Sequence, residues 1–355
     1  MNNRFMAVSL AFVALALHSE LTCSQSSIPR PNGAVYERIT VYGEALEGNL
    51  SGDSPTRDVS VYLPPSYATR PQRRFPVLYL LHGLGSSDAD WFIEPNSYNV
   101  ADAADRALVN GAKEMIIVMP NARTRFLGSM YGSSVTTGDW EKFITRDLIR
   151  HIDANYRTIA RRAGRGLAGH SMGGYGALRI GMKAPGKFAA VYAMSPCCLT
   201  PTLAPSPTFQ TLAANMLTVM QTDETQLEHA PLVVQSIIAQ AAAWSPNPVN
   251  PPFYLDLPIS NSTPRPEIIG MWAANAPLAM LPQYIPELKS FEGIAIDAGN
   301  LDQPIAGTVQ SLDQTLQNYE IAHTSEIYSG DHINQIGLRL ETNVLPFFST
   351  HLKGK

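Results

Sequence analysis

A serine flanked by glycines is the residue of this sequence best suited to covalent chemistry. The segment Gly169-His170-Ser171-Met172-Gly173-Gly174 places a glycine two positions before and two positions after Ser171. This G-x-S-x-G spacing is typical of a sharp turn between a strand and a helix, which presents the serine oxygen outside the sheet. An apolar strand pattern precedes Ser171 and a helical pattern follows it, so we predict that Ser171 is a nucleophile.

A serine hydroxyl needs a base that accepts its proton, and that base needs an acid that orients it. The histidines that follow Ser171 are His229, His323, His332 and His351. His332 comes directly after the last predicted strand, in Ser329-Gly330-Asp331-His332. Active sites of open α/β sheets lie at the carboxyl ends of the strands. We therefore predict that His332 is the base.

Three aspartates near the ends of the last two predicted strands are candidates for the acid: Asp297, Asp302 and Asp331. Asp297 ends a strand and is expected to be partly buried, whereas Asp302 lies in the following loop, which can reach over the sheet edge. Asp331 is the sequence neighbour of His332, and adjacent side chains rarely face each other. We predict Asp302 as the acid, with Asp297 as the alternative.

Acyl transfer places negative charge on a carbonyl oxygen, and fixed N–H groups stabilise that charge. The backbone N–H of Met172, directly after the nucleophile, is the first predicted donor. The second is expected in the loop His82-Gly83-Leu84-Gly85, where Leu84 is the predicted donor and Gly83 the alternative. Because these groups complete the chemistry, the sequence predicts no metal and no organic cofactor.

The elements that must position these residues alternate between strands and helices, which predicts an α/β fold with a mostly parallel central sheet flanked by helices. Apolar or alternating patterns predict strands over residues 36–42, 59–63, 77–81, 115–119, 166–169, 189–193, 293–297 and 324–328. The two earliest of these strands are expected near an exposed edge. Helical patterns cover residues 101–110, 140–156, 171–183, 309–319 and 333–348.

Residues 199–290 interrupt this alternation with many prolines and two helical patterns, at 208–220 and 232–244. We predict a cap-like insertion over the strand ends, within one domain of residues 30–355. Its large apolar side chains can either line an acyl pocket or pack inside the insertion, and packing is favoured for each: Met216, Met220, Trp244, Phe253, Tyr254 and Trp272.

The composition predicts a large core and excludes some classes of partner. The chain has 355 residues, 45% of them hydrophobic, and a net charge of −4, which disfavours nucleic acid. Arg161, Arg162 and Arg165 cluster before a strand and are interpreted as a solvated turn. The G-x-G-x-x-G match over residues 164–169 does not follow a strand and has no acidic residue at the required distance, so no dinucleotide site is predicted.

The N-terminus has the pattern of an export signal. A short apolar run over residues 5–17 follows Arg4, and small residues near position 24 would allow cleavage, so we predict a signal peptide over residues 1–24. The mature protein is then expected to be secreted or periplasmic, without a stable membrane span; a lipid-modified Cys23 stays open. The adjacent Cys197 and Cys198 are interpreted as small buried side chains at a strand end.

The motifs together resemble the esterase D family of α/β-hydrolases, which includes feruloyl esterases, S-formylglutathione hydrolases and the antigen 85 mycolyltransferases. The resemblance is carried by residues 61–67, 75–83, 296–302 and 330–332, and it matches the acid of the family to Asp302. It implies an α/β-hydrolase fold and a serine esterase mechanism.

Within that family, residues 85–91 look closest to the feruloyl esterase type. S-formylglutathione hydrolases carry Thr-Cys where this chain has Gly85-Ser86, and antigen 85 proteins carry an acid in place of His82. We therefore predict an exported carboxylic ester hydrolase acting on small or polysaccharide-linked esters, such as feruloyl or acetyl esters of plant polysaccharide. The alternatives are an acyltransferase of the antigen 85 type and a non-catalytic binding protein on a hydrolase scaffold.

Overall fold

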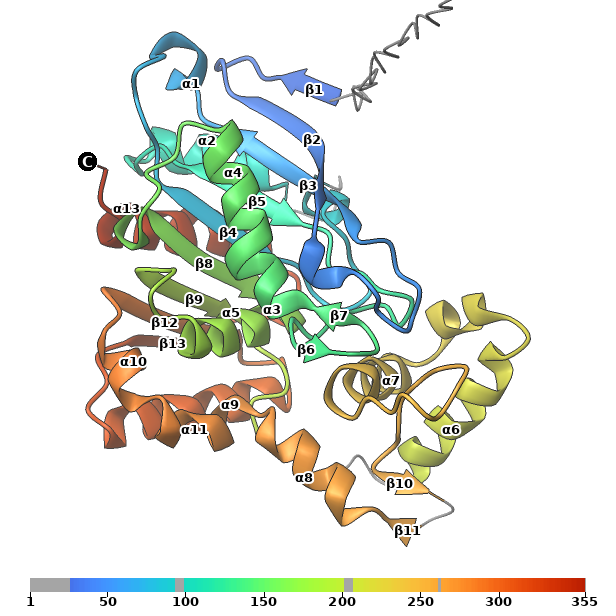
Figure 1. The fold of residues 1–355 in the computed structure, drawn as a ribbon. Coiled ribbons are helices and arrows are strands. Elements are labelled where there is room, and N and C mark those ends of the chain that lie inside the picture. The colour runs from blue at the N-terminus through green and yellow to red at the C-terminus, as the bar shows by residue number, and fades with distance from the viewer. Residues whose placement is uncertain (1–25, 93–98, 201–206, 261–262, 355) are drawn as a thin grey trace, which may run out of the picture.

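A nine-stranded sheet forms the centre of the computed structural model, which describes residues 26–92, 99–200, 207–260 and 263–354. The strand order is β1-β2-β3-β5-β4-β8-β9-β12-β13 (Figure 1). The pairings from β1 to β5 are antiparallel, and those from β5 to β13 are parallel. The strands are β1 (Ser26–Pro29), β2 (Val35–Tyr42), β3 (Thr56–Leu63), β4 (Val77–Leu81), β5 (Ile116–Pro120), β8 (Arg165–His170), β9 (Ala190–Met194), β12 (Gly293–Gly299) and β13 (Thr324–Tyr328).

Helices cover both faces of the sheet, and the strand residues alternate between the two resulting cores. In β4, Val77, Tyr79 and Leu81 belong to one core, and Leu78 and Leu80 belong to the other. Successive side chains of a strand point to opposite faces, so apolar residues at every position are the expected pattern of a sheet buried on both sides. The first core contains α4 (Ile149–Asn155), α5 (Met172–Lys183) and α11 (Ile305–Asn318); the second contains α2 (Val100–Val109), α12 (Ile336–Arg339) and α13 (Leu345–His351).

The predicted elements are present, with differences in the sheet and in two of the helices. β3 was expected near an edge but lies between β2 and β5, and its Val59 and Val61 are fully buried. The edge strand β1 was not predicted. The helix predicted over residues 140–156 is divided into α3 (Trp140–Lys142), a π-helical segment Phe143–Leu148 and α4, and the C-terminal helix contains a similar segment, Leu340–Val344. The periodicity of apolar residues in the sequence cannot reveal a π-helical segment, because the buried face of the helix continues through it.

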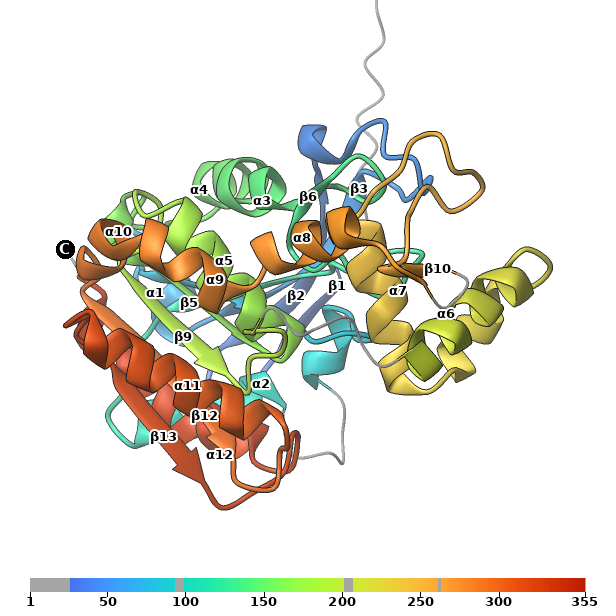
Figure 2. The same cartoon turned by 90° about the horizontal axis from the view of Figure 1, so that it is seen from below.

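The segment predicted as an insertion forms several helices and a small hairpin. Figure 2 shows α6 and α7 projecting to one side of the sheet, whereas α9 and α10 lie near α5. The last helices of the predicted insertion, α9 and α10, therefore pack beside α5 in the helical layer that covers the sheet. Its elements are α6 (Pro207–Met220), α7 (Leu232–Trp244), β10 (Ile259–Ser260), β11 (Thr263–Pro264), α8 (Pro266–Ala274), α9 (Pro277–Met280) and α10 (Ile285–Lys289).

The other short elements are α1 (Ser66–Thr69) and the hairpin of β6 (Ser133–Ser134) and β7 (Gly138–Asp139). Short 3-10 helices form at Glu44–Leu46, Ala89–Phe92, Arg162–Gly164, Glu224–His229 and Leu281–Gln283. In the described ranges, no helix is both long enough and apolar enough to cross a membrane. The predicted signal peptide and Cys23 lie outside the described residues.

Candidate active site

Ser171 occupies a strained turn between β8 and α5. Its backbone angles are φ 58° and ψ −118°, a region that non-glycine residues rarely adopt. The neighbouring glycines make the turn possible. A Cβ atom on Gly173 would lie 2.0 Å from the carbonyl oxygen of Leu81, and one on Gly169 would lie 2.3 Å from the backbone of Gly173. The spacing recognised in the sequence therefore has a steric cause.

The structure brings Ser171, His332 and Asp302 together, although they come from three separate loops. The Oγ atom of Ser171 lies 3.0 Å from Nε2 of His332, and Nδ1 of His332 lies 2.8 Å from Oδ2 of Asp302. A neutral ring that donates its Nδ1–H to the carboxylate keeps Nε2 free to accept the serine proton. Nucleophile, base and acid thus have the geometry of a catalytic triad.

The alternative residues have other partners. Asp297 accepts hydrogen bonds from the Tyr192 hydroxyl at 2.7 Å and from Arg339 at 2.7 Å and 2.9 Å. Burial raises the pKa of Asp297, and Arg339 partly offsets this shift. Asp331 is half-buried and accepts the N–H groups of Ile333 and Asn334, and His323 contacts Asp313. The structure therefore keeps these groups away from Ser171.

The predicted oxyanion-hole residues surround the nucleophile. Gly83 passes so close to Ser171 that a Cβ atom on Gly83 would lie 3.4 Å from the Cβ of Ser171. Gly83 and Leu84 line a cavity of about 220 Å³ together with Ser171 and His332. Met172 is the first residue of the 12-residue helix α5, where backbone N–H groups lack partners within the helix. Both predicted donors are therefore beside Ser171.

His82, which appears in the sequence only as part of the His82-Gly83 motif, forms hydrogen bonds that hold the predicted oxyanion-hole loop. Its Nε2 accepts the N–H of Ala122 at 2.8 Å, so the ring proton of the neutral form is on Nδ1, which lies 2.8 Å from the Gly83 carbonyl oxygen. In a trans peptide the C=O and N–H groups point in opposite directions. Because His82 holds the Gly83 carbonyl, the Leu84 N–H is directed away from the imidazole of His82.

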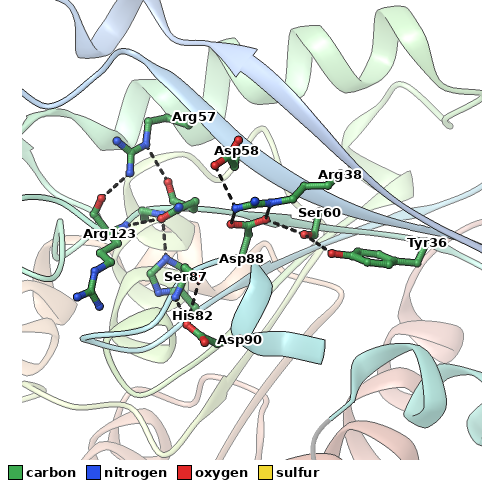
Figure 3. A network of polar contacts seen from close by, with 12 residues as sticks. Tyr36, Arg38, Arg57, Asp58, Ser60, His82, Ser87, Asp88, Asp90 and Arg123 are labelled. Carbon is green, nitrogen blue, oxygen red and sulfur yellow. Dashed lines mark hydrogen bonds and ion pairs between the residues drawn. The ribbon is translucent and has the colours of Figure 1, made fainter. Parts of the chain in front are cut away.

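A polar network fixes the rest of this loop, residues 82–90 (Figure 3). Asp88 is fully buried and accepts bonds from Arg38 at 2.8 Å and 2.9 Å and from the Ser60 hydroxyl at 2.7 Å. Arg123 donates to the Gly85 carbonyl from the opposite side. Charged hydrogen bonds on both sides restrict the loop before a substrate arrives, which is what a preorganised oxyanion hole requires.

His170 contacts the backbone of His332, the predicted base, as His82 contacts the backbone of the predicted oxyanion-hole loop. Its Nε2 lies 2.7 Å from the backbone carbonyl oxygen of His332, and the two imidazole rings are 4.7 Å apart. Burial lowers the pKa of His170 to about 3, so the ring is neutral and can donate Nε2–H to that carbonyl. The histidine at the second position of the G-x-S-x-G motif thus supports the loop that carries His332.

The cavity beside the nucleophile has an apolar wall and a polar end. Trp91, Ile333 and Ile336 contribute apolar surface, and Ser87 and Asp90 contribute polar groups. Of the described insertion residues, only one lines this cavity, Leu232. Several predicted lid residues are instead buried inside the protein, in agreement with the packing interpretation: Met220, Trp244, Phe253 and Trp272.

The sequence also led to expectations about metal ligands, about the two adjacent cysteines and about the arginines near residue 161. The described residues contain no group of three or more His, Cys, Asp or Glu side chains that could hold a metal ion. Cys197 and Cys198 are free and half-buried, so the expectation that both are buried was wrong. The interpretation of Arg161, Arg162 and Arg165 as a solvated turn was only partly right, because the Arg165 side chain is buried against Asp153.

The buried His82 predicts a pH dependence of stability. Burial lowers its pKa to about 4, below the value of about 6.5 for a free imidazole. Between these pH values the unfolded chain takes up a proton that the folded chain does not, so the free energy of unfolding falls as the pH falls from 6.5 to 4. This residue accounts for up to roughly 3 kcal/mol. Urea unfolding at several pH values measures the slope.

We expect His82→Gln to reduce this slope, because glutamine keeps polar groups at the site without titrating, and the buried His170 should account for part of the slope that is left. His229→Gln, at an exposed position, is the control and should leave the slope as in the wild type. An unchanged slope in His82→Gln would contradict a neutral, buried His82.

The fold and the arrangement of Ser171, His332 and Asp302 define the α/β-hydrolase class with a serine-centred site. A match to the Esterase family model covers residues 54–335, and the chain therefore belongs to the Esterase family. Both findings agree with the resemblance stated from the sequence.

Curated relatives match over part of their length. Esterase Rv1288 of Mycobacterium tuberculosis is 38% identical over 133 residues, which is 37% of this chain and 27% of that protein. An endo-1,4-beta-xylanase/feruloyl esterase of Xylanibacter ruminicola is 32% identical over 36% of this chain and 18% of its own length. The matched segment thus spans about a quarter or less of these longer relatives.

Solved structures show the same fold over nearly the whole chain. A ferulic acid esterase superposes with a TM-score of 0.62 and 22% identity, covering 90% of this chain and 99% of that chain. Mycobacterium tuberculosis MPT51 superposes with a TM-score of 0.56 and 16% identity, covering 90% and 99%. At these identities the likeness describes architecture.

Proposed function

We propose that this protein is an exported serine carboxylic ester hydrolase that works through an acyl-enzyme on Ser171. The observation that supports this proposal most directly is the continuous hydrogen-bonded series Ser171–His332–Asp302. It lies at the carboxyl ends of the parallel strands, where catalytic groups of open α/β sheets collect. Export is proposed from the N-terminal sequence pattern alone.

The proposed reaction proceeds in two half-reactions. The Ser171 oxygen attacks the ester carbonyl carbon while its proton moves to Nε2 of His332, and the Leu84 and Met172 N–H groups stabilise the oxyanion. The ester C–O bond then breaks, and His332 gives the proton to the departing alcohol. Water, deprotonated by His332, attacks the acyl-enzyme, and the carboxylic acid and free Ser171 are released.

The cavity supports an aromatic acyl group with a phenolic hydroxyl, such as a feruloyl group. Trp91, Ile333 and Ile336 provide the apolar contacts that an aromatic ring needs. The Oδ2 atom of Asp90 accepts the backbone N–H and the hydroxyl of Ser87, so Oδ1 can accept a phenolic O–H. We propose feruloyl esters of plant polysaccharide as the substrate class.

A comparison of esters tests this substrate class. We expect the protein to hydrolyse both methyl ferulate and p-nitrophenyl acetate, and we expect Asp90→Ala to lower kcat/KM for methyl ferulate by about 10-fold or more. Because Asp90 also holds Ser87 in the loop of residues 82–90, the acetate rate of the variant measures any damage to that loop, and the loss for methyl ferulate should exceed the loss for acetate by about 10-fold. Turnover of the acetate alone by the wild type would contradict the feruloyl proposal and favour small acyl groups.

A further inference from the structure

The arginine side chains of the described residues fall into two groups. Most form ion pairs with a carboxylate: Arg30, Arg38, Arg73, Arg106, Arg123, Arg125, Arg146, Arg150, Arg165, Arg179, Arg265 and Arg339. Within the described residues, the other arginines form no ion pair: Arg57, Arg70, Arg74, Arg157, Arg161 and Arg162. With the exception of Arg57, these lie in residues 70–74 and 157–162.

These two segments lie side by side at one end of the sheet. Phe75 pairs with Thr158 in a parallel bridge, with backbone bonds of 2.8 Å from Phe75 N–H to Arg157 and from Ile159 N–H to Phe75. They lead into the amino ends of β4 and β8, whereas Ser171 follows the carboxyl end of β8. In Figure 1, α1 and the C-terminal end lie on the side away from the insertion.

The two segments enclose a groove of about 900 Å³, here called the arginine groove. It is lined by Arg70, Pro71, Gln72, Arg73, Arg74, Ile159, Ala160, Arg161 and Gly354, and these lining residues include no carboxylate side chain. Arg73 is held by Glu114 and Ser66 and stacks 4.7 Å from the Phe75 ring. Arg70, Arg74 and Arg161 are exposed. The groove is thus a concentrated positive charge on a chain whose net charge is −4.

We propose that the arginine groove binds an acidic polysaccharide through its uronate carboxylates. The planar guanidinium fork matches the two oxygens of a carboxylate, and Arg70, Arg74 and Arg161 are not committed to protein carboxylates. Pro71, Ile159 and Ala160 add small apolar surfaces suited to the faces of sugar rings. The concave shape of the groove fits an extended polymer chain, whereas a flat membrane surface could not enter it.

The choice of a polysaccharide rests on the proposed function, whereas the anionic character of the ligand rests on the groove alone. The groove and the nucleophile lie at opposite ends of the sheet, so binding there does not contribute to the chemical step. It keeps the enzyme on the polymer, and a tethered enzyme encounters neighbouring esters at a raised effective concentration.

Electrophoresis in native gels containing polygalacturonate tests the proposal on the full mature chain. We expect the polymer to retard the wild type and the variant Arg70→Gln/Arg74→Gln/Arg161→Gln to bind about 10-fold more weakly or worse. The matched control, Arg106→Gln/Lys142→Gln/Arg150→Gln, loses the same charge at exposed positions elsewhere and leaves Arg146 paired with the buried Asp147. Retardation of the wild type should decrease as salt rises, and neutral arabinoxylan should cause little retardation.

Equal retardation of the two triple variants would overturn the assignment to the groove. So would an absence of binding by the wild type at low salt, or binding to anionic phosphatidylglycerol vesicles with none to polygalacturonate. Hydrolysis of p-nitrophenyl acetate should be equal in the wild type and both variants. A loss of polymer binding therefore stays distinguishable from a failure of the proposed esterase reaction, which would appear as absent hydrolysis in all three proteins.

Discussion

Replacement of Ser171 by alanine is expected to lower kcat by about 10³-fold or more on every ester that the wild type hydrolyses. The Ser171 oxygen is the atom that bonds to the acyl group, and His332 and Asp302 act only through it. The change removes one oxygen from a partly exposed turn, so the fold should be retained. Initial rates on p-nitrophenyl acetate, with both proteins matched by circular dichroism, provide the measurement.

The substitution Ser195→Ala is a control that separates loss of the nucleophile from general damage to the site. Ser195 follows Met194, whose carbonyl accepts the Ser171 N–H. Ser195 is buried and its backbone N–H donates to the Asp297 carbonyl, so Ser195→Ala removes a hydroxyl near the site without touching the triad. It should keep a rate close to that of the wild type. Equal rates for the wild type and Ser171→Ala would contradict the assignment of the nucleophile.

The second large effect is expected for Asp302→Asn, which should lower kcat by roughly 10³–10⁴-fold. Asparagine can donate an amide N–H to Nδ1 of His332, which would favour the tautomer with the proton on Nε2. That nitrogen then cannot accept the serine proton. The loss should appear mainly in kcat, because the carboxylate does not line the cavity beside Ser171.

The comparison with Asp297→Asn decides between the two candidate acids. Asp297 forms a buried pair with Arg339, so its replacement should lower the free energy of unfolding by about 3–5 kcal/mol. Folded Asp297→Asn should retain most of the activity. If Asp297→Asn were inactive while folded and Asp302→Asn were active, the acid would be Asp297, and the proposed triad would be wrong.

The site residues could be predicted because each follows from a local rule. Glycines around Ser171 indicate an elbow, and the loops after predicted strands narrow the choice of His332 and Asp302. These rules work because parallel strands place their carboxyl ends at one edge. The position of β3 inside the sheet could not be predicted in this way, since its neighbours β2 and β5 are set by long-range pairing.

The supporting residues were missed for a different reason. The Ala122 N–H holds the His82 ring, and His170 contacts the His332 carbonyl, so each role depends on a contact between segments that are distant in sequence. Asp88 likewise meets Arg38 across two strands. No spacing in the sequence encodes these contacts, although a histidine next to a glycine-rich turn is a useful signal when a loop must be held in place.

Covalent labelling tests the central claim most directly. The mature protein would be treated with a fluorophosphonate probe, digested and analysed by mass spectrometry. The account predicts one adduct, on Ser171, that is absent in Ser171→Ala and strongly slowed in Asp302→Asn. An unlabelled but folded wild type, or an adduct on another residue, would contradict a nucleophilic Ser171, and an unlabelled protein would favour a binding protein on a hydrolase scaffold.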